Sequence, residues 1–523
     1  MTHPTVDDWL RPRDRRGFLL AASSFAFMPL LGREAHGFLP RSGFKAEPFS
    51  LGVASGDPSP DGFVIWTRLA PDPLNGGGMP KENVEVRWEI AHDEKMSKIV
   101  QRGTTMATPE LGHSVHVEVE GLEPDRWYWY RFGSNGAASR TGRSRTTPRF
   151  DASPQKVNFA FASCQHFESG YFNSYRHILD DDIDLIVHLG DYIYEYGGVD
   201  GRVRKHTGKE INSLDEYRNR YALYRTDTDL KAAHQMFPWL VTWDDHEFDN
   251  NCAGDISEEP GVKTAGYLAR RARAYQAYYE HMPLRKSSIP KGPFLQLYRS
   301  VPFGNLVEFE VLDTRQYRTD QPCGDGNKPP CEGVFAKDAT LLGDRQEQWL
   351  MQTLHESPAT WNVLAQQVMM ARVDRDPESG IAWSMDQWAG YHVARHRMLS
   401  FLENRRISNP VVLTGDIHKN WVNDLKVDFD DEKSETVATE FVGTSITSGG
   451  NGSEKGSDTD GVLRDNPFVK FYNAERGYVR CQITPGEWRS DFRVVDDVTK
   501  PDTTCKTRAS FVVEAGRAGA ERA

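Results

Sequence analysis

Hydrophobic and polar residues alternate strictly over the first part of the chain. Residues 84–90 (Val-Glu-Val-Arg-Trp-Glu-Ile) and residues 114–119 alternate with a period of two. Residues 62–67 and the aromatic run 127–132 have the same strand-like character. Short alternating strands with turn signals between them are typical of antiparallel β-sandwiches. The pattern therefore predicts an all-β sandwich domain over residues 46–150.

From about residue 155 the pattern changes to continuous apolar runs separated by helical stretches. This alternation predicts layered α/β structure, with helices covering sheets, over residues 155–500. The Gly/Ser/Asp-rich stretch 448–461 is expected to be a flexible loop, and the tail 514–523 to be disordered. The predicted helices cover residues 171–180, 264–282, 344–356 and 391–403.

The N-terminus places Arg15 and Arg16 directly before an apolar stretch that runs from Phe18 to Leu31. A membrane-spanning helix needs about 20 apolar residues, so this stretch is short. The order of features is typical of a twin-arginine export signal, although a chance Arg-Arg pair before a buried helix would look similar. We expect a signal peptide over residues 1–37, the twin-arginine translocase as partner during export, and a periplasmic or secreted, cell-surface location. The mature protein is expected to have no transmembrane segment.

Composition places the chain among ordinary globular proteins. It has 523 residues, of which 38% are apolar and 26% charged, a length that fits two domains. The formal net charge of -12 argues against a role in coating nucleic acid, which demands a basic face. An oxidising destination permits disulfides. Cys323 and Cys331, which flank a Gly/Asn/Pro loop, are the first candidate pair, and Cys481 with Cys505 is the second.

Five predicted buried strands each end in a cluster of polar side chains. Ligands of open α/β sheets bind at the carboxyl ends of the strands, so these clusters are expected to converge on one point. A single strand followed by Gly-Asp usually means only a turn, whereas the ordered set is far more specific. The clusters are Cys164–His166, Gly190–Glu195, Asp244–Glu247, Gln366-Gln367 and Gly415–His418.

The ordered set resembles the calcineurin-like metallophosphoesterase superfamily and, within it, the alkaline phosphatase D (PhoD-like) family. The resemblance covers nearly everything after the expected signal. One departure is Ala389, where the family would have Asp, so a supporting role for that carboxylate is in doubt. The segments that carry the resemblance are Gly52–Pro58, Gly190–Glu195, Trp243–Glu247, Asp313–Arg318, Leu364–Val368 and Glu440–Ser445.

The resemblance implies an α/β fold class in which an N-terminal all-β, immunoglobulin- or fibronectin-like sandwich precedes a layered αββα metallophosphoesterase domain. The stretch Leu122-x-Pro124-x-x-x-Tyr128 is similar to the corner found in immunoglobulin- and fibronectin-like modules. This likeness concerns the fold and says nothing about chemistry.

The resemblance also implies a bridging metal ligand at Asp191. Tyr194 lies three residues further on, the spacing at which purple acid phosphatases supply a phenolate to ferric iron. Cys164 stands where the first superfamily ligand belongs, and thiolate and phenolate suit a redox metal and not calcium. We therefore expect Cys164, Asp191, Tyr194 and His418 to bind ferric iron. From position alone, a buried hydrophobic Cys164 and a core Tyr194 are the alternatives.

The second predicted metal site exchanges nitrogen ligands for oxygen ligands. Relatives commonly carry Asn-His, Gly-His-x-His and a histidine after the fourth strand. The matching segments here are Asp245-His246, Gly415–His418 and Gln366-Gln367. Calcium takes six to eight oxygen ligands, so oxygen-rich sites favour it. The expected calcium ligands are Asp191, Asp245, Asp416 and, as a further candidate, Gln366; a buried amide pair satisfied by backbone is the alternative for the glutamines.

These ligands predict an exported metal-dependent alkaline phosphatase or phosphodiesterase. Two cations would neutralise the charge of a phosphate ester, and in-line attack by a metal-bound hydroxide is expected, with no phospho-enzyme. His246 is expected to stabilise the phosphoryl group or protonate the leaving alkoxide, or else to orient Asp245. Arg315 could clamp phosphate bidentately, and an ion pair with Asp313 or another carboxylate is an equal alternative.

Two other functions remain open at the level of sequence. The same site could serve a secreted phosphodiesterase of phospholipase D type that acts on lipid head groups or teichoic acids. A non-catalytic surface-binding protein is the other alternative, but the complete set of ligand types at the strand ends argues against it.

Overall fold

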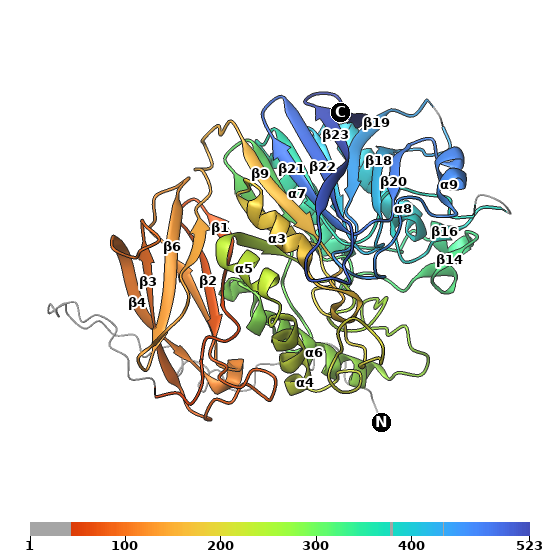
Figure 1. Cartoon of the computed structure of the whole chain (residues 1–523). Helices are drawn as coiled ribbons and strands as arrows, with labels where there is room; N and C mark the ends of the chain where they lie inside the picture. Colours follow the sequence, from red (N-terminus) through yellow and green to blue (C-terminus); the bar gives the residue numbers. More distant parts are fainter. Residues whose placement is uncertain (1–42, 377–379, 432) are drawn as a thin grey trace. The chain divides into compact units, whose positions relative to one another are not determined.

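The computed structural model of this chain describes residues 43–376, 380–431 and 433–523. The expected signal peptide over residues 1–37 lies outside these residues. The described part is mixed α/β with several sheets, as the sequence predicts (Figure 1). A search of the described helices found none that is both long and apolar enough to cross a membrane.

Two large sheets carry most of the strands. The ten-stranded sheet has the order β24 (Glu521–Arg522), β23 (Cys505–Glu514), β22 (Glu487–Val495), β21 (Gly477–Ile483), β9 (Val157–Ala162), β10 (Leu185–His188), β11 (Pro238–Val241), β1 (Val53–Ser59), β2 (Gly62–Arg68) and β5 (Ser114–Val119). The seven-stranded sheet has the order β12 (Arg299–Phe303), β13 (Val307–Val311), β15 (Trp361–Ala365), β17 (Pro410–Thr414), β19 (Thr436–Val442), β18 (Asn420–Lys426) and β20 (Val469–Asn473).

Two smaller sheets and a set of helices complete the described architecture. A five-stranded sheet contains β4 (Ile99–Ala107), β3 (Val84–Ala91), β6 (Trp127–Ser134), β7 (Ala137–Ala138) and β8 (Gly142–Arg145), and β14 (Asn327–Lys328) pairs with β16 (Trp383–Ser384). The helices are α3 (Asn173–Asp180), α4 (Leu214–Tyr224), α5 (Thr228–Met236), α6 (Thr264–His281), α7 (Gly343–Glu356), α8 (His392–Arg405) and α9 (Thr459–Asp465).

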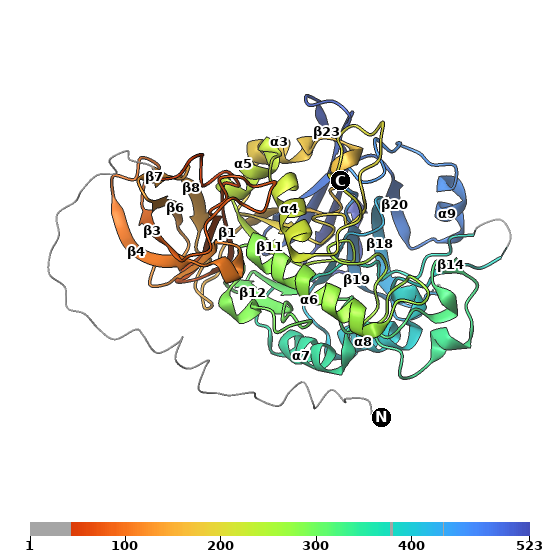
Figure 2. The same cartoon turned by 90° about the horizontal axis from the view of Figure 1, so that it is seen from below.

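The two large sheets share one hydrophobic core. Phe159 of β9 meets Phe309 of β13 edge to face, with ring centroids 5.1 Å apart. The outer face of the ten-stranded sheet packs with α3 to α6, and that of the seven-stranded sheet with α7 to α9. Figure 2 shows α4 and α6 side by side, in keeping with their common core. Because both faces are covered, strands β9, β10, β15 and β17 are continuous apolar runs, not alternating ones.

The N-terminal strands differ from the expected self-contained sandwich. Strands β3, β4 and β6 form a sheet of their own, but β1 pairs in parallel with β11, so β1, β2 and β5 extend the ten-stranded sheet. Gly56 permits this junction, since a Cβ there would lie 2.7 Å from the Trp239 carbonyl oxygen. The predicted corner is present in part, because the Tyr128 hydroxyl accepts a hydrogen bond from the Glu123 N–H at 2.9 Å.

The four predicted helices are all present, with ends within two residues of those expected. Helices α4 and α5 were not predicted, although Ser213 and Glu216 form a capping box at the start of α4. Helix α9 begins inside the stretch expected to be a loop. The prediction of a disordered tail is wrong, because β24 folds back and pairs with β23 through Phe511 and Arg522.

The cysteines confirm one predicted disulfide and correct the other. Cys323 and Cys331 are bonded to each other. Cys481 and Cys505 are free. They lie on β21 and β23, with β22 between them, and they are also out of register: Cys481 pairs with Ser490 and Cys505 with Val495, so they are too far apart for a disulfide.

Glu310, on β13 of the seven-stranded sheet, provides a test of how burial affects a carboxylate in this fold. Its side chain is fully buried, and neither carboxylate oxygen has a hydrogen-bond partner among the described residues. Burial raises the pKa of Glu310 well above its usual value, and the nearby Glu308 adds to the shift. The unfolded chain ionises at the ordinary pKa, about 4.3. The stability that Glu310 contributes is therefore complete below that pH and is lost as the pH rises through the folded-state pKa.

We expect Glu310→Gln to raise the thermal unfolding midpoint at pH 8 and to change it much less at pH 4, because the amide does not ionise. Differential scanning calorimetry across this pH range measures the effect. Glu308→Gln is the matched control, since Glu308 is only partly buried and accepts a hydrogen bond from the Ser300 hydroxyl at 2.7 Å. An equal midpoint for Glu310→Gln and the parent at pH 8 would contradict the assignment.

Candidate metal centre

The predicted convergence of strand ends is present in the structure. Cys164, Asp191 and Asp244 follow the adjacent strands β9, β10 and β11, and Gln366 and Asp416 follow the adjacent strands β15 and β17. Backbone hydrogen bonds join these ends within each sheet: the Cys164 N–H donates to the Gly190 carbonyl at 3.1 Å, and the Gly415 N–H to the Gln367 carbonyl at 2.9 Å. A parallel bridge between Ser163 and Ser445 joins the two sheets.

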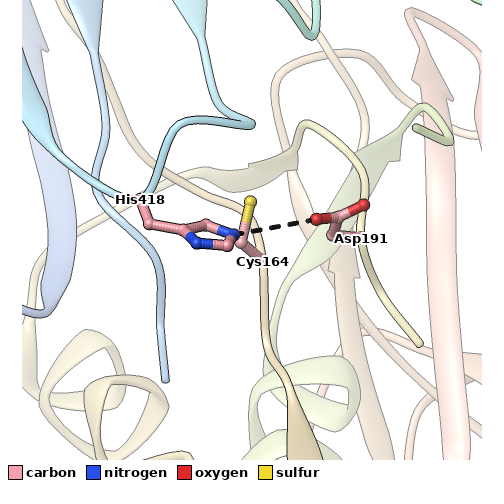
Figure 3. A group of neighbouring side chains, drawn as sticks. All are labelled: Cys164, Asp191 and His418. Carbon is pink, nitrogen blue, oxygen red and sulfur yellow. Dashed lines mark ion pairs between the residues drawn. The ribbon is translucent and has the colours of Figure 1, made fainter. Parts of the chain in front are cut away.

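Three of the four predicted iron ligands form the first donor group, and the fourth, Tyr194, contacts two of them. Cys164, Asp191 and His418 each offer a ligand atom, and these atoms lie within 4.8 Å of one another (Figure 3). The Tyr194 hydroxyl donates to Asp191 Oδ2 at 2.7 Å and lies 3.2 Å from His418 Nε2. The structure thus brings a thiol, a phenol, a carboxylate and an imidazole to one point.

Two further donor groups continue from the first. Asp191, Asp245 and His246 form one, and Asp244, Asp245 and Asp416 form the other, each with ligand atoms within 4.8 Å. Asp191 belongs to two groups and so does Asp245, so the donors form a continuous run. The run begins with sulfur and nitrogen donors and ends with carboxylate oxygens alone.

The backbone is strained at the donor positions. Four donor residues have φ in the left-handed region: Cys164 at 58°, Asp191 at 55°, Asp416 at 63° and His418 at 54°. Residues other than glycine rarely adopt this conformation, and those that do cluster at functional sites. Each of the four residues lies in a turn that follows its strand. The surrounding sheets hold this geometry in place.

The buried groups at this site favour the binding of a cation, because burial raises their pKa values and a cation would stabilise their ionised forms. Burial raises the pKa of the Cys164 thiol and of the Tyr194 hydroxyl, and the Asp191 carboxylate raises both further. Burial also raises the pKa of Asp416 to about 7, against the opposing effect of Arg315. Asp244 Oδ2 is buried and has no hydrogen-bond partner among the described residues. A bound cation would stabilise the ionised form of all these groups, so the residues fit a metal.

His246 lies between this donor run and an acidic partner. Its Nδ1 is 2.9 Å from Glu195 Oε2, and its ring packs against Tyr194 in a tilted arrangement with centroids 4.1 Å apart. Burial lowers the pKa of His246, but the carboxylates of Glu195, Asp191 and Asp245 outweigh burial and raise the pKa above its usual value. Although His246 belongs to the middle donor group, its imidazole is therefore also placed to hold a proton.

The two glutamines are not brought into the donor run. The Gln366 amide donates to the Val368 carbonyl and the Thr414 hydroxyl, and its oxygen accepts from Trp388 Nε1 at 3.0 Å. Gln367 likewise bonds to backbone and hydroxyl groups, among them the Thr242 hydroxyl at 2.8 Å. This arrangement favours the alternative of a buried amide pair over the expected calcium ligand.

Arg315 is fully buried, and carboxylates surround its guanidinium group. Nε donates to Asp244, Nη1 donates to both oxygens of Asp386 at 2.9 and 2.8 Å, and Nη2 donates to Asp416 Oδ1 at 2.8 Å. The backbone N–H also donates to Asp313 at 3.1 Å. These contacts favour the ion-pair interpretation of Arg315 over a direct phosphate clamp.

Several functional residues were missed by sequence reasoning. Asp244 and Glu195 each adjoin a selected residue, and a search for further carboxylates in those clusters would have found them. Glu247 accepts backbone hydrogen bonds from Tyr192 at 2.5 Å and Asp244 at 2.8 Å, which ties two donor turns together, and burial raises its pKa to about 8. Asp386, which binds Arg315, and Ser448, whose hydroxyl lies 2.7 Å from the Tyr194 oxygen, follow no motif in the sequence.

A fourth group of possible ligands, His166, Glu168 and His206, lies near the first. Glu168 accepts hydrogen bonds from the Val199 and His206 N–H groups at 3.0 and 2.9 Å. His206 Nε2 is 3.0 Å from the Tyr224 hydroxyl, and its Nδ1 is 3.0 Å from the Tyr196 carbonyl oxygen. These bonds account for the group as an anchor for the loop before α4.

Gly190 separates two donor turns and offers a test of the geometry. It has φ of 108°, and a Cβ there would lie 2.3 Å from Asp244 Cβ and 2.6 Å from the Asp244 backbone nitrogen. We expect Gly190→Ala to push Asp191 and Asp244 apart, so that the protein loses bound metal and has a lower thermal unfolding midpoint. Elemental analysis and calorimetry measure both effects.

Gly266→Ala is the matched control for this substitution. Gly266 lies on the exposed face of α6, and a Cβ there meets nothing within 4 Å. This change should keep the metal and stabilise the helix by up to about 1 kcal/mol. Normal metal content in Gly190→Ala would refute the claim that this glycine is required at the centre.

Comparison with known proteins agrees with the geometry. The family model for the PhoD-like phosphatase matches residues 159–492, and the model for the PhoD-like phosphatase N-terminal domain matches residues 35–148. The chain is 51% identical over 516 residues to alkaline phosphatase D of Bacillus subtilis (strain 168), covering 97% of this chain and 88% of that protein. A solved structure described as the structure of PhoD shares 52% identity with a TM-score of 0.90, and the match covers 92% of this chain and 93% of that one. The chain therefore belongs to the PhoD-like phosphatase family.

Proposed function

We propose that this chain, a phosphoric ester hydrolase of the PhoD-like phosphatase family, hydrolyses phosphate esters at the run of donor groups that starts at Cys164 and ends at Asp416. The observation that carries this proposal is the convergence of sulfur, phenol, imidazole and carboxylate donors, four of them on strained backbone, at the ends of adjacent strands. When bound, metal ions supply Lewis-acid neutralisation of the phosphoryl charge and a water of lowered pKa. The substrate is proposed to be a phosphate ester that approaches from the same edge.

The first donor group is proposed to hold ferric iron. Cys164 supplies a soft thiolate and Tyr194 an electron-rich phenolate, and Asp191 and His418 complete the set. Thiolate and phenolate favour a redox-active transition metal over calcium. The Ser448 hydroxyl lies 2.7 Å from the Tyr194 oxygen, where it can donate to the phenolate form. The donor chemistry therefore supports iron at this end.

The oxygen-rich end is proposed to hold calcium. Asp191, Asp245 and Asp416 are the ligands expected from the sequence, and the unpartnered buried oxygen of Asp244 lies in the same donor group as Asp245 and Asp416. Carboxylate oxygens without nitrogen or sulfur favour a hard cation. Gln366 stays a prediction that its hydrogen bonds do not support.

His246 is proposed to be the proton donor to the leaving alkoxide. Glu195 fixes the ring through Nδ1, and the surrounding carboxylates keep it protonated. The same imidazole can stabilise the phosphoryl charge before it gives up the proton. After the transfer, Glu195 holds the neutral ring in the orientation from which it is reprotonated by solvent.

Three finer features of the chain are also proposals. The paired arginines Arg15 and Arg16 before an apolar stretch support export by the twin-arginine pathway to the periplasm or cell surface. The core that the two large sheets share, with helices on both outer faces, supports an αββα arrangement. The core common to β1, β2 and β5 and to β3 and β6 supports an immunoglobulin-like N-terminal sandwich.

Tyr194→Phe tests the proposed iron ligand. The phenylalanine keeps the ring but removes the phenolate, so we expect the visible absorption of a tyrosine-ligated ferric protein to disappear and the phosphatase rate to fall. Absorption spectra, iron content and rates with p-nitrophenyl phosphate measure these effects on protein purified without added metal.

Tyr192→Phe is the control for this experiment. Its hydroxyl lies 2.9 Å from His234 Nε2 and outside the donor groups, so colour and rate should persist. A parent protein that is colourless and free of iron, yet fully active, would rule out the proposed iron site.

His246→Asn tests the proton donor. Protonation matters most when the leaving group is a poor one, so we expect a loss of about 10²- to 10⁴-fold on alkyl phosphates. The loss should be much smaller on p-nitrophenyl phosphate, whose leaving group needs no proton. Glu195→Gln, which keeps the contact to Nδ1 but removes the charge, should show the same pattern more weakly. Equal losses on both substrates would instead indicate a role in metal binding or in orienting Asp245.

A further inference from the structure

Arg315 joins carboxylates from three separate segments of the chain. Its guanidinium group contacts Asp244 after β11, Asp386 after β16 and Asp416 after β17, and Nη2 lies 3.6 Å from Asp245 Oδ1. Three of these four carboxylates make up the all-oxygen donor group. Asp386 lies outside every donor group found among the described residues.

The position of Arg315 is fixed by its own backbone. Asp313 Oδ1 accepts hydrogen bonds from the N–H groups of Arg315 and Gln316 at 3.1 and 2.9 Å. Gln346 binds the Asp313 backbone twice, accepting from its N–H and donating to its carbonyl, both at 2.8 Å. Arg315 is therefore held by the scaffold, independently of the carboxylates that it contacts.

A guanidinium group offers a geometry that no other side chain has. Its five N–H groups lie in one plane and point in three directions, so it can bind three carboxylates at once. Without a positive charge, carboxylates gathered this closely repel one another and would separate or become protonated. The fork of Arg315 instead holds one oxygen each of Asp244 and Asp416. Among the described residues, the second oxygen of Asp244 has no partner, and that of Asp416 accepts a hydrogen bond from Gln387 at 3.4 Å.

We propose that Arg315 is a positioning residue that assembles Asp244, Asp245 and Asp416 into a preformed oxygen site for a hard divalent cation. It acts through these carboxylates and does not touch the substrate. This inference rests on the proposed calcium site and adds what holds that site together. Among the described residues Arg315 makes no hydrogen bond or ion pair with Cys164 or Tyr194, so the soft end of the donor run does not depend on it.

Arg315→Lys tests the inference, because lysine keeps the charge but loses the fork. The protein is purified with its iron, stripped of divalent ions with a mild chelator, and titrated with calcium chloride in a calorimeter. We expect the dissociation constant for calcium to rise about 10- to 100-fold, the size of effect that supporting residues have on metal affinity. Iron content and visible absorption should stay as in the parent.

Asp386→Asn is the second variant, in case the lysine variant does not fold. Asp386 holds Nη1 of Arg315 and also contacts Arg318, but it belongs to no donor group, so it is not itself a proposed calcium ligand and its substitution loosens Arg315. Its calcium affinity should fall in the same direction. Arg68→Lys is the control: Arg68 is equally buried but bonds to the Gly112 carbonyl and His281, away from the carboxylates, so calcium binding should match the parent.

The outcomes separate the two proposals. If the parent binds no calcium, the proposed calcium site fails and this inference fails with it. If the parent binds calcium and both Arg315→Lys and Asp386→Asn bind it as tightly, only the inference is overturned. Loss of iron in proportion to calcium would also overturn it, because that result means general disruption and not the loss of one oxygen site.

Discussion

The structure depends on the balance of charge at one edge of its two large sheets. Five carboxylates gather there, those of Asp191, Asp244, Asp245, Asp386 and Asp416. The buried guanidinium groups of Arg315 and Arg318 pair with all of these except Asp191. If all five ionise, three negative charges remain unbalanced. Burying such charge without compensation costs far more than a fold can supply, so the groups must take up protons or bind cations. The sulfur and phenol donors beside them make cations the chemically consistent answer.

The fold supplies rigidity where the chemistry needs it. The turns that carry Cys164, Asp191, Asp416 and His418 hold a backbone conformation that most residues avoid, and such strain persists only when the surroundings over-determine it. Here the surroundings are parallel strands buried on both faces, a core common to both sheets, and Glu247, which accepts backbone hydrogen bonds from two of the donor turns. Stability elsewhere in the domain thus maintains the strained geometry of the site.

The sequence was sufficient to predict those parts of the site that depend on the local order of strands and polar clusters along the chain. Polar clusters after buried strands must meet when those strands are adjacent and parallel, so Cys164, Asp191, Asp245 and Asp416 could be placed in advance. Prediction from the sequence failed where packing between distant segments determines the structure. Asp386 reaches Arg315 from a segment without any motif, the glutamines after β15 turn their amides toward backbone, and β1 joins β11 across nearly two hundred residues. The tail was wrongly predicted to be disordered, because composition does not reveal a strand that pairs with an open sheet edge.

The order of donors along the site gives a reason for the proposed division of labour between two unlike metals. Asp191 belongs to the soft group and to the middle group, and Asp245 to the middle and the all-oxygen groups, so neighbouring cations would share carboxylates. Sharing lowers the repulsion between cations, because each bridging carboxylate screens one from the next. The soft end can hold an ion tightly through Cys164 and Tyr194, whereas the oxygen end, already partly neutralised by Arg315, can bind and release a hard ion more easily. A firmly held centre would then fix the nucleophile, and an exchangeable one would leave room for the phosphoryl oxygens.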